Sequence, residues 1–363
     1  MRPRYGDEML WDLCHLCQFL NELQELQLKA SRDFPIGGTA SRFRQSGNAP
    51  AVQAILNVAL PIFGVILAGY LAGRWRILGG ESTTALNAFV SYFALPVLFF
   101  GTLARTPVAA VLDPGLMAGF GIVVLATFLL GMATTRLVSR GGLAAMSLQG
   151  IAASWGNVGY MGVPLCLAAF GEAGLPPAML TVIVTAIVAM VIGVMLIELE
   201  VAAGHGPLRT FLRAAFNVAR NPLPVSIALG IVVSAIGLPI PTPVEKWLDL
   251  LGAAAAPCAL FAIGLFLSDK SIRSGLAEAG CATAIKLLLQ PLAAWLVLPF
   301  FVDLASVPGK VALLMAALPT AANAFVLAKQ FDIAVEQNSA SVLLSTAFSV
   351  ITVSALLVLL RVS

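Results

Sequence analysis

The sequence predicts an all-α polytopic membrane protein, with ten transmembrane helices arranged as two inverted repeats of five helices each. Hydrophobic residues make up 59% of the chain and charged residues 11%, against roughly 45 to 50% and 25% in soluble domains. Apolar stretches of nearly the roughly 20 residues that cross a bilayer recur between short polar breaks. The two halves also resemble each other. Most of the chain is therefore expected to lie within a membrane.

Residues 1–53 are expected to lie outside the membrane, as a short amphipathic helix followed by a flexible linker. Between Asp7 and Lys29, apolar residues recur at helical spacing opposite Asp12, Glu22 and Glu25. The segment has neither the basic start nor the apolar centre of a signal peptide. We interpret it as an optional extension.

Ten apolar segments are expected to span the membrane. They run over residues 54–73, 84–104, 115–138, 144–169, 177–201, 222–238, 247–267, 277–301, 308–328 and 337–360. The first five form one repeat over residues 54–201, and the last five form a second over residues 222–363. Residues 202–221 are expected to be a short cytoplasmic loop.

The proposed repeats share the positions of their prolines. Pro61 and Pro224 lie at the start of spans one and six, and Pro96 and Pro257 lie within spans two and seven. The two pairs have nearly the same separation along the chain, as corresponding positions of a repeat must. A repeat with an odd number of spans enters the membrane from the opposite side the second time, which predicts inverted repeats.

Spans four and nine carry the pattern of broken helices, with Asn157, Gly159 and Pro164 in one and Pro319 and Asn323 in the other. Proline removes a backbone donor and clashes with the preceding turn, so both helices are expected to break. Unpaired backbone in hydrocarbon is costly unless it lines a cavity. Free N–H groups at half-helix N-termini suit a carboxylate, and we therefore expect all five residues to form a binding site. The alternative is that these residues only kink and pack helices.

Lys286 and Gln290 lie one helical turn apart in span eight and are a second pair of candidate binding residues. An ammonium at the centre of a bilayer costs roughly 2.5 to 3.5 kcal/mol, which favours a functional role. The alternative is that Lys286 extends its ammonium to the cytoplasmic surface. Glu198 and Glu200 end span five, where a solvated helix end is a simpler interpretation than an ion site.

Several classes of function are not expected. The net charge of +3 is small and dispersed, so we expect no nucleic-acid partner. Cys14 and Cys17 form an isolated C-x-x-C without the second pair that a zinc site needs, so we expect no metal and no cofactor. No nucleotide-binding or hydrolase motif is present in the sequence, and an enzyme is not expected.

Five segments together resemble the auxin efflux carrier family, and the resemblance covers about residues 54–360. They are Asn57 to Arg74, Asn87 to Phe99, Gly156 to Pro164, Asn221 to Gly230, and Leu318 to Lys329. The family is distantly similar to bile acid:sodium symporters. The resemblance implies a scaffold domain, a mobile transport domain, crossing broken helices at spans four and nine, and a homodimer. It also makes Pro164 and Pro319 the crossover prolines and places Asn157 and Asn323 beside the substrate.

The expected function is secondary transport of a small organic anion by alternating access, with efflux driven by the membrane potential as the expected mode. Only about twenty residues separate spans five and six. The plant auxin exporters have a long loop there, so the chain looks more similar to bacterial members linked to malonate or malate. The alternatives are a sodium-coupled organic anion symporter and a sensor or channel of the same fold. The expected location is the plasma membrane, which is the inner membrane of a bacterium, in contact with lipid.

Lysine and arginine in the short loops predict the orientation of the spans. One set of loops holds ten of them, namely Arg74, Arg76, Arg136, Arg140, Arg209, Arg213, Arg220, Lys270, Arg273 and Lys329. The other set holds four, namely Arg105, Lys246, Lys310 and Arg361. Positive residues accumulate on the cytoplasmic side, so the first set is expected to be cytoplasmic.

This orientation is tested by cysteine labelling. Cysteines introduced at Arg209 and Gly309 should react with an impermeant maleimide from opposite sides of intact cells, with position 209 protected until the cells are opened, because the loop charges place it in the cytoplasm. Labelling of both positions from the same side would contradict the ten-span topology.

Overall fold

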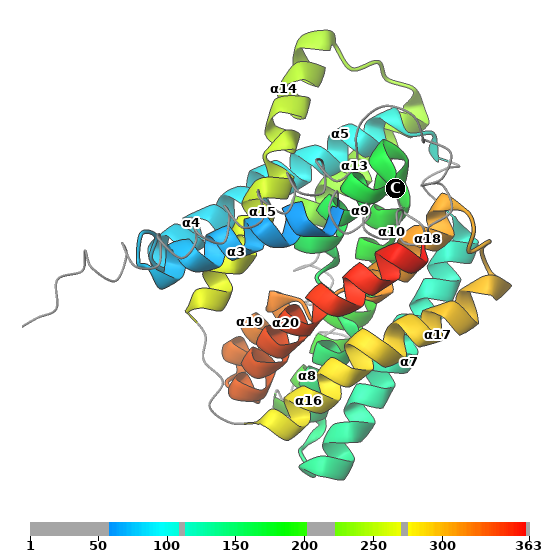
Figure 1. Cartoon of the computed structure of the whole chain (residues 1–363). Coiled ribbons are helices and arrows are strands. Elements are labelled where there is room, and N and C mark those ends of the chain that lie inside the picture. Colours follow the sequence, from blue (N-terminus) through cyan, green and yellow to red (C-terminus); the bar gives the residue numbers. More distant parts are fainter. Residues whose placement is uncertain (1–57, 109–112, 202–221, 270–274, 361–363) are drawn as a thin grey trace, which may run out of the picture. The chain divides into compact units, whose positions relative to one another are not determined.

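The computed structural model describes residues 58–108, 113–201, 222–269 and 275–360 (Figure 1). The amphipathic helix and linker expected before residue 54, and the loop expected over residues 202–221, lie outside this part of the chain. The described residues form helices and their connections, with one isolated β-bridge and no named strand among them. The all-α class is therefore confirmed.

The described part of the chain consists mainly of helical elements. In chain order they are α3 (Leu60–Arg74), α4 (Gly80–Phe89), η3 (Val90–Ala94), α5 (Leu95–Arg105), α7 (Pro114–Val138), α8 (Leu143–Ser154), η4 (Val158–Gly162), α9 (Val163–Phe170), η5 (Gly171–Gly174), α10 (Leu175–Ala186), η6 (Ile187–Gly193), α11 (Val194–Val201), α13 (Pro222–Ile236), α14 (Thr242–Ala253), α15 (Ala255–Ser268), α16 (Leu276–Ala284), η7 (Ile285–Leu289), α17 (Gln290–Val297), η8 (Leu298–Phe300), α18 (Val307–Ala316), α19 (Ala322–Phe331) and α20 (Val335–Leu359).

Six helical stretches among the described residues are long and apolar enough to cross a membrane. They cover residues 80–105, 114–138, 158–201, 242–268, 276–300 and 335–359. Four shorter apolar helices, α3, α8, α13 and α18, cover 10 to 15 residues each. Two of these, α8 and α18, are short because they end where spans four and nine are interrupted.

Three prolines coincide with a widened helical turn. Pro96, Pro164 and Pro291 each follow a π-helical turn, in η3, η4 and η7. In each case the residue before the proline donates its N–H to the carbonyl five residues back. Proline clashes with the carbonyl four residues back, and the wider turn accommodates it without ending the helix.

The first group of packed helices consists of α3, α4, α5, α13, α14 and α15. Within it, α3 packs on α15, and α5 packs on both α13 and α14 (Figure 1). Glycines bring α3 and α15 close together, because a Cβ atom at Gly69 would collide with the Phe261 backbone and one at Gly264 with the backbone of Ile66 and Tyr70. Small residues allow such close approach of membrane helices.

The second group consists of α7 to α11 and α16 to α20. In it, α7 packs on α8 and α17, α8 on α11 and α16, α10 on α18, and α20 on both α16 and α19. Gly131 and Gly150 interlock α7 with α8, since a Cβ atom at either would contact the backbone of the other helix. The two groups meet where α15 contacts η4 and α9 and where α10 contacts α5.

Glu200 has a structural role in the second group. One of its carboxylate oxygens accepts the backbone N–H of Ala144 at 2.7 Å, in the first turn of α8. A carboxylate at a helix N-terminus satisfies a free donor and opposes the helix dipole. Glu200 is exposed at the end of α11, as expected of a solvated helix end, and it also caps α8.

Candidate functional site

Two helix breaks meet at the centre of the second group. Helix α8 ends at Ser154 and the chain becomes helical again at Val158, while α18 ends at Ala316 and α19 begins at Ala322. Both breaks fall within spans four and nine, as predicted. Each half-helix therefore presents an open C-terminus or an open N-terminus inside the protein.

The two interrupted segments pair with each other as a short antiparallel bridge. This pairing satisfies backbone groups that the breaks would leave free. Gly156 pairs with Thr320, the Asn157 N–H donates to the Pro319 carbonyl at 2.7 Å, and the Ala321 N–H donates to the Trp155 carbonyl at 2.9 Å.

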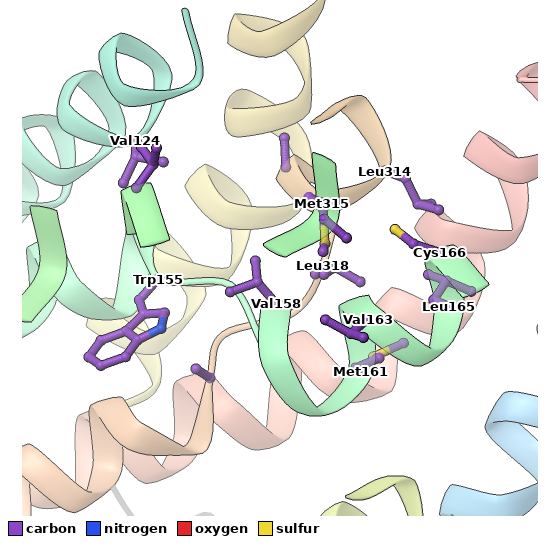
Figure 2. Packing of buried hydrophobic residues seen from close by; sticks show 14 of the residues in the cluster. Val124, Trp155, Val158, Met161, Val163, Leu165, Cys166, Leu314, Met315 and Leu318 are labelled. Carbon is purple, nitrogen blue, oxygen red and sulfur yellow. The ribbon is translucent and has the colours of Figure 1, made fainter. Parts of the chain in front are cut away.

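Thr320 links the crossing to the helices around it. Its hydroxyl donates to the Ala152 carbonyl in α8 at 2.8 Å, and its N–H donates to the Ser345 hydroxyl on α20 at 3.0 Å. Thr320 is fully buried. Apolar side chains pack beside these bonds, and Val158, Met315 and Leu318 lie close together where the segments cross (Figure 2). A Cβ atom at Gly162 would collide with Met315 and Leu318.

Lys286 and Gln290 cap the C-terminal ends of the broken helices. The Lys286 ammonium donates to the Ala316 carbonyl at the end of α18 at 2.8 Å, and also to the Gln290 side-chain oxygen. The Gln290 amide donates to the Ser154 carbonyl at the end of α8 at 3.0 Å. Both side chains are fully buried. Helix C-termini carry partial negative charge, so an ammonium is stabilised there.

The N-terminal ends of the half-helices, in contrast, keep free donors. Among the described residues, no acceptor is recorded for the backbone N–H groups of Gly159 and Tyr160 in η4 or of Ala322 and Asn323 in α19. All four residues line one cavity. The partial positive charge of two helix N-termini is therefore directed at the same space.

This cavity has a volume of about 380 Å³ and lies between the two groups of helices. Its walls come from α4, η3, α13 and α15 on one side and from η4, α10 and α19 on the other. None of the described residues that line it carries a charged side chain. The polar groups that line it are Asn87, Ser91, Asn157, Tyr160 and Asn323, together with the crossing backbone.

Three asparagine amides and one pair of hydroxyl groups define the polar part of the cavity. Asn157 is buried and Asn323 is exposed, and neither side-chain amide hydrogen-bonds another described residue. Tyr160 is within 2.5 Å of the Ser91 hydroxyl and donates weakly, at 3.4 Å, to the Asn87 carbonyl. The Tyr160 hydroxyl therefore connects the crossing to the first group of helices.

The structure places six of the seven predicted site residues in three positions around the crossing, and the seventh, Pro164, lies elsewhere. Asn157, Gly159 and Asn323 line the cavity, and Pro319 lies in the crossing with its carbonyl in the bridge. Lys286 and Gln290 do not line the cavity and lie at the C-termini of the broken helices.

Pro164 requires a correction. The sequence placed the break of span four at this proline, but the break comes earlier in the chain, at positions 155–157. Pro164 begins α9 and lies against a second cavity of about 370 Å³, which α5, α9, α14 and α15 also line. The π turn of η4 accommodates the proline, so it does not have to interrupt the helix.

Three polar residues of the cavity were not predicted as site residues from the sequence. Asn87 and Ser91 belong to span two and Tyr160 to η4. Asn87 and Ser91 are polar residues one helical turn apart in an otherwise apolar span, and this spacing could have marked them as candidate site residues. Which cavity they face depends on helix packing, which the sequence does not express.

Comparisons with known proteins identify relatives over most of the chain. The family described as "Membrane transport protein" matches residues 54–206 and 208–357. The "Putative malonate transporter" of Rhizobium meliloti is 33% identical over 307 residues, which cover 85% of this chain and 96% of the relative. The "Uncharacterized transporter YfdV" of Escherichia coli K12 is 26% identical over 81% of this chain and 93% of its own. "Auxin efflux carrier component 8" of Arabidopsis thaliana is 23% identical over 80% and 93%.

The support that Thr320 gives to the crossing leads to a stability prediction. Thr320→Val removes the donor to the Ala152 carbonyl in a buried position and should cost about 1 to 3 kcal/mol, seen as a lower melting temperature of the purified protein. Thr283→Val is the matched control, because the Thr283 hydroxyl is buried without a hydrogen bond among the described residues. Equal melting temperatures of the two variants would mean that the Thr320 hydroxyl does not support the crossing.

Proposed function

The chain belongs to the membrane transport protein family that includes the auxin efflux carriers, and from this premise we propose that it moves a small carboxylate anion across the membrane by alternating access. It is a multi-pass transporter of the plasma membrane, and its family and relatives are transporters and not enzymes. The observation that carries the proposal is the cavity that receives two half-helix N-termini.

The chemistry of the cavity favours an anion. Four backbone N–H groups and three side-chain amides supply donors, and no carboxylate among the described residues lines the wall to repel a negative charge. Half-helix N-termini that meet at the midplane bind the anionic groups of substrates in other secondary transporters. A volume of about 380 Å³ lies in the range of small-molecule sites, roughly 300 to 1,000 Å³. The malonate in one relative's name, a dicarboxylate, agrees with this class.

Two symmetry relations support the proposed ten-span architecture in inverted repeats. The separation of Gly156 from Thr320 along the chain nearly equals that of the proline pairs. If each residue of the bridge is replaced by the residue at this separation in the other repeat, each of the two bridge hydrogen bonds becomes the other one. Likewise, α3 packs on α15 and α13 packs on α5. If each span is replaced by the one five spans away, these two pairs exchange. Both relations are those of a two-fold axis in the membrane plane.

The two groups of helices suggest how access could alternate. The first group corresponds to the scaffold domain expected from the family, and the second, which holds the crossing, to the mobile transport domain. In the orientation expected from the loop charges, the 380 Å³ cavity lies in the cytoplasmic half of the spans and the cavity near Pro164 lies in the outer half. A shift of the second group against the first would then transfer the site from one side to the other. A homodimer through the first group is the assembly that we propose.

Coupling to a cation is not required for export of an anion. One charge moved through 100 mV is worth about 2.3 kcal/mol, so an inside-negative potential could expel a monovalent anion. No acidic side chain of the described residues lines the cavity. The proposal is therefore potential-driven efflux, and the alternatives are sodium-coupled symport and a sensor or channel that does not transport.

Transport by purified protein in proteoliposomes tests the function. We expect saturable flux of malonate or a related carboxylate that responds to potentials set with potassium and valinomycin and persists without sodium. Flux that requires sodium and ignores the potential would establish the symporter. Binding of carboxylates without any flux would establish the sensor, and absence of both would contradict an anion carrier.

The amides of the cavity give a second prediction. Asn157→Ala or Asn323→Ala should weaken the apparent affinity for the carboxylate about tenfold to a hundredfold, because a hydrogen bond to a charged group contributes roughly 1.5 to 3 kcal/mol. The control is Asn338→Ala, since Asn338 is buried on α20, away from the residues that line the cavity. Affinities within about twofold of the wild type in both cavity variants, with normal folding, would show that the crossing is only a packing device.

A further inference from the structure

Lys286 has an environment that neither surface exposure nor substrate contact explains. Its side chain is fully buried, and its ammonium donates inward to the Ala316 carbonyl and to Gln290, which excludes an ammonium that extends to the surface. It does not line the 380 Å³ cavity. In the described part of the chain the two recorded ion pairs both involve Arg105, so Lys286 has no carboxylate partner there.

The partners of Lys286 are the groups that bind a cation in other transporters. Half-helix C-termini and unwound carbonyls coordinate sodium or a proton at the midplane of secondary transporters with broken helices. Here the same kind of position, at the ends of α18 and α8, is occupied by the ammonium of Lys286 and the amide of Gln290. The covalently attached cation thus satisfies the carbonyl at the end of α18, and the neutral Gln290 amide, which it also contacts, satisfies the carbonyl at the end of α8.

Only the backbone of one residue separates this ammonium from the cavity. Gly156 lines the cavity, and a Cβ atom added to it would lie 3.1 Å from both Cε and Nζ of Lys286. A charge buried at this depth is weakly screened, so its field reaches the cavity. The ammonium also offsets the partial negative charge at the C-terminus of α18, which leaves the positive ends dominant on the cavity side.

We propose that Lys286 is a built-in counter-ion of the crossing, a positioning residue that replaces a free monovalent cation and favours the anion through the backbone of Gly156 without touching it. The effect on substrate rests on the proposed function. The claim that Lys286 replaces a free cation does not rest on the proposed function, because it concerns only the stability of the crossing.

The first experiment measures the crossing without any substrate. The melting temperature of purified wild type should be the same in sodium, propylammonium and choline chlorides at equal ionic strength. Lys286→Ala should melt at a lower temperature, and propylammonium, whose chain fits the space that the lysine leaves, should restore most of the loss while choline does not. Lys329→Ala, which removes an exposed lysine on α19, should show neither effect.

The second experiment measures substrate affinity and keeps the proposal falsifiable if Lys286→Ala does not fold. Lys286→Met keeps a long apolar side chain and removes the charge. It should weaken the apparent affinity for malonate about tenfold or more, whereas Lys286→Arg should keep most of it.

The two experiments test separate parts of the proposal, and each part can be contradicted without the other. A wild-type melting temperature that rises with sodium, or a folded Lys286→Ala that no small cation stabilises, would overturn the built-in cation. Wild-type malonate affinity in Lys286→Met would overturn its effect on the anion. If no variant and no wild type transports, while propylammonium still rescues Lys286→Ala, the counter-ion stands and only the proposed transport fails.

Discussion

The structure depends on one constraint, that backbone polar groups inside hydrocarbon must find partners within the protein. Two interrupted helices would each leave N–H and C=O groups free. They meet at Gly156 and Thr320 and satisfy part of that demand with each other. The close packing of α7 on α8, the hydroxyl of Thr320 and the apolar side chains around Met315 all hold the two segments in this register.

The crossing has two chemically different faces. On one face, helix C-termini receive donors from Lys286 and Gln290 within a buried core. On the other, helix N-termini keep free N–H groups beside a cavity whose described lining carries no charged side chain. A satisfied face costs little to bury, while an unsatisfied one is stable only with water or an anion beside it.

Sequence reasoning was most successful where a rule about the membrane applied directly. It located the breaks of spans four and nine, and three of the residues that line the cavity, from glycine, proline and asparagine inside apolar runs. It was wrong about Pro164, because a π turn can accommodate a proline and the sequence does not distinguish a widened turn from a break. It missed Ser91 and Tyr160, whose hydrogen bond joins two segments that are distant along the chain.

The sequence by itself determined the class of the protein, because apolar length and composition decide whether a segment can lie in a bilayer, and the order of its motifs indicated the family. Only the tertiary structure decided which polar side chains form hydrogen bonds with which backbone groups. Lys286 and Asn157 are both polar residues in apolar spans, and no local pattern distinguishes a cap from an amide that faces a cavity. Helix packing places one at the C-terminal ends and the other at the N-terminal ends of the same broken helices. The role of each follows from the sign of the partial charge at that end.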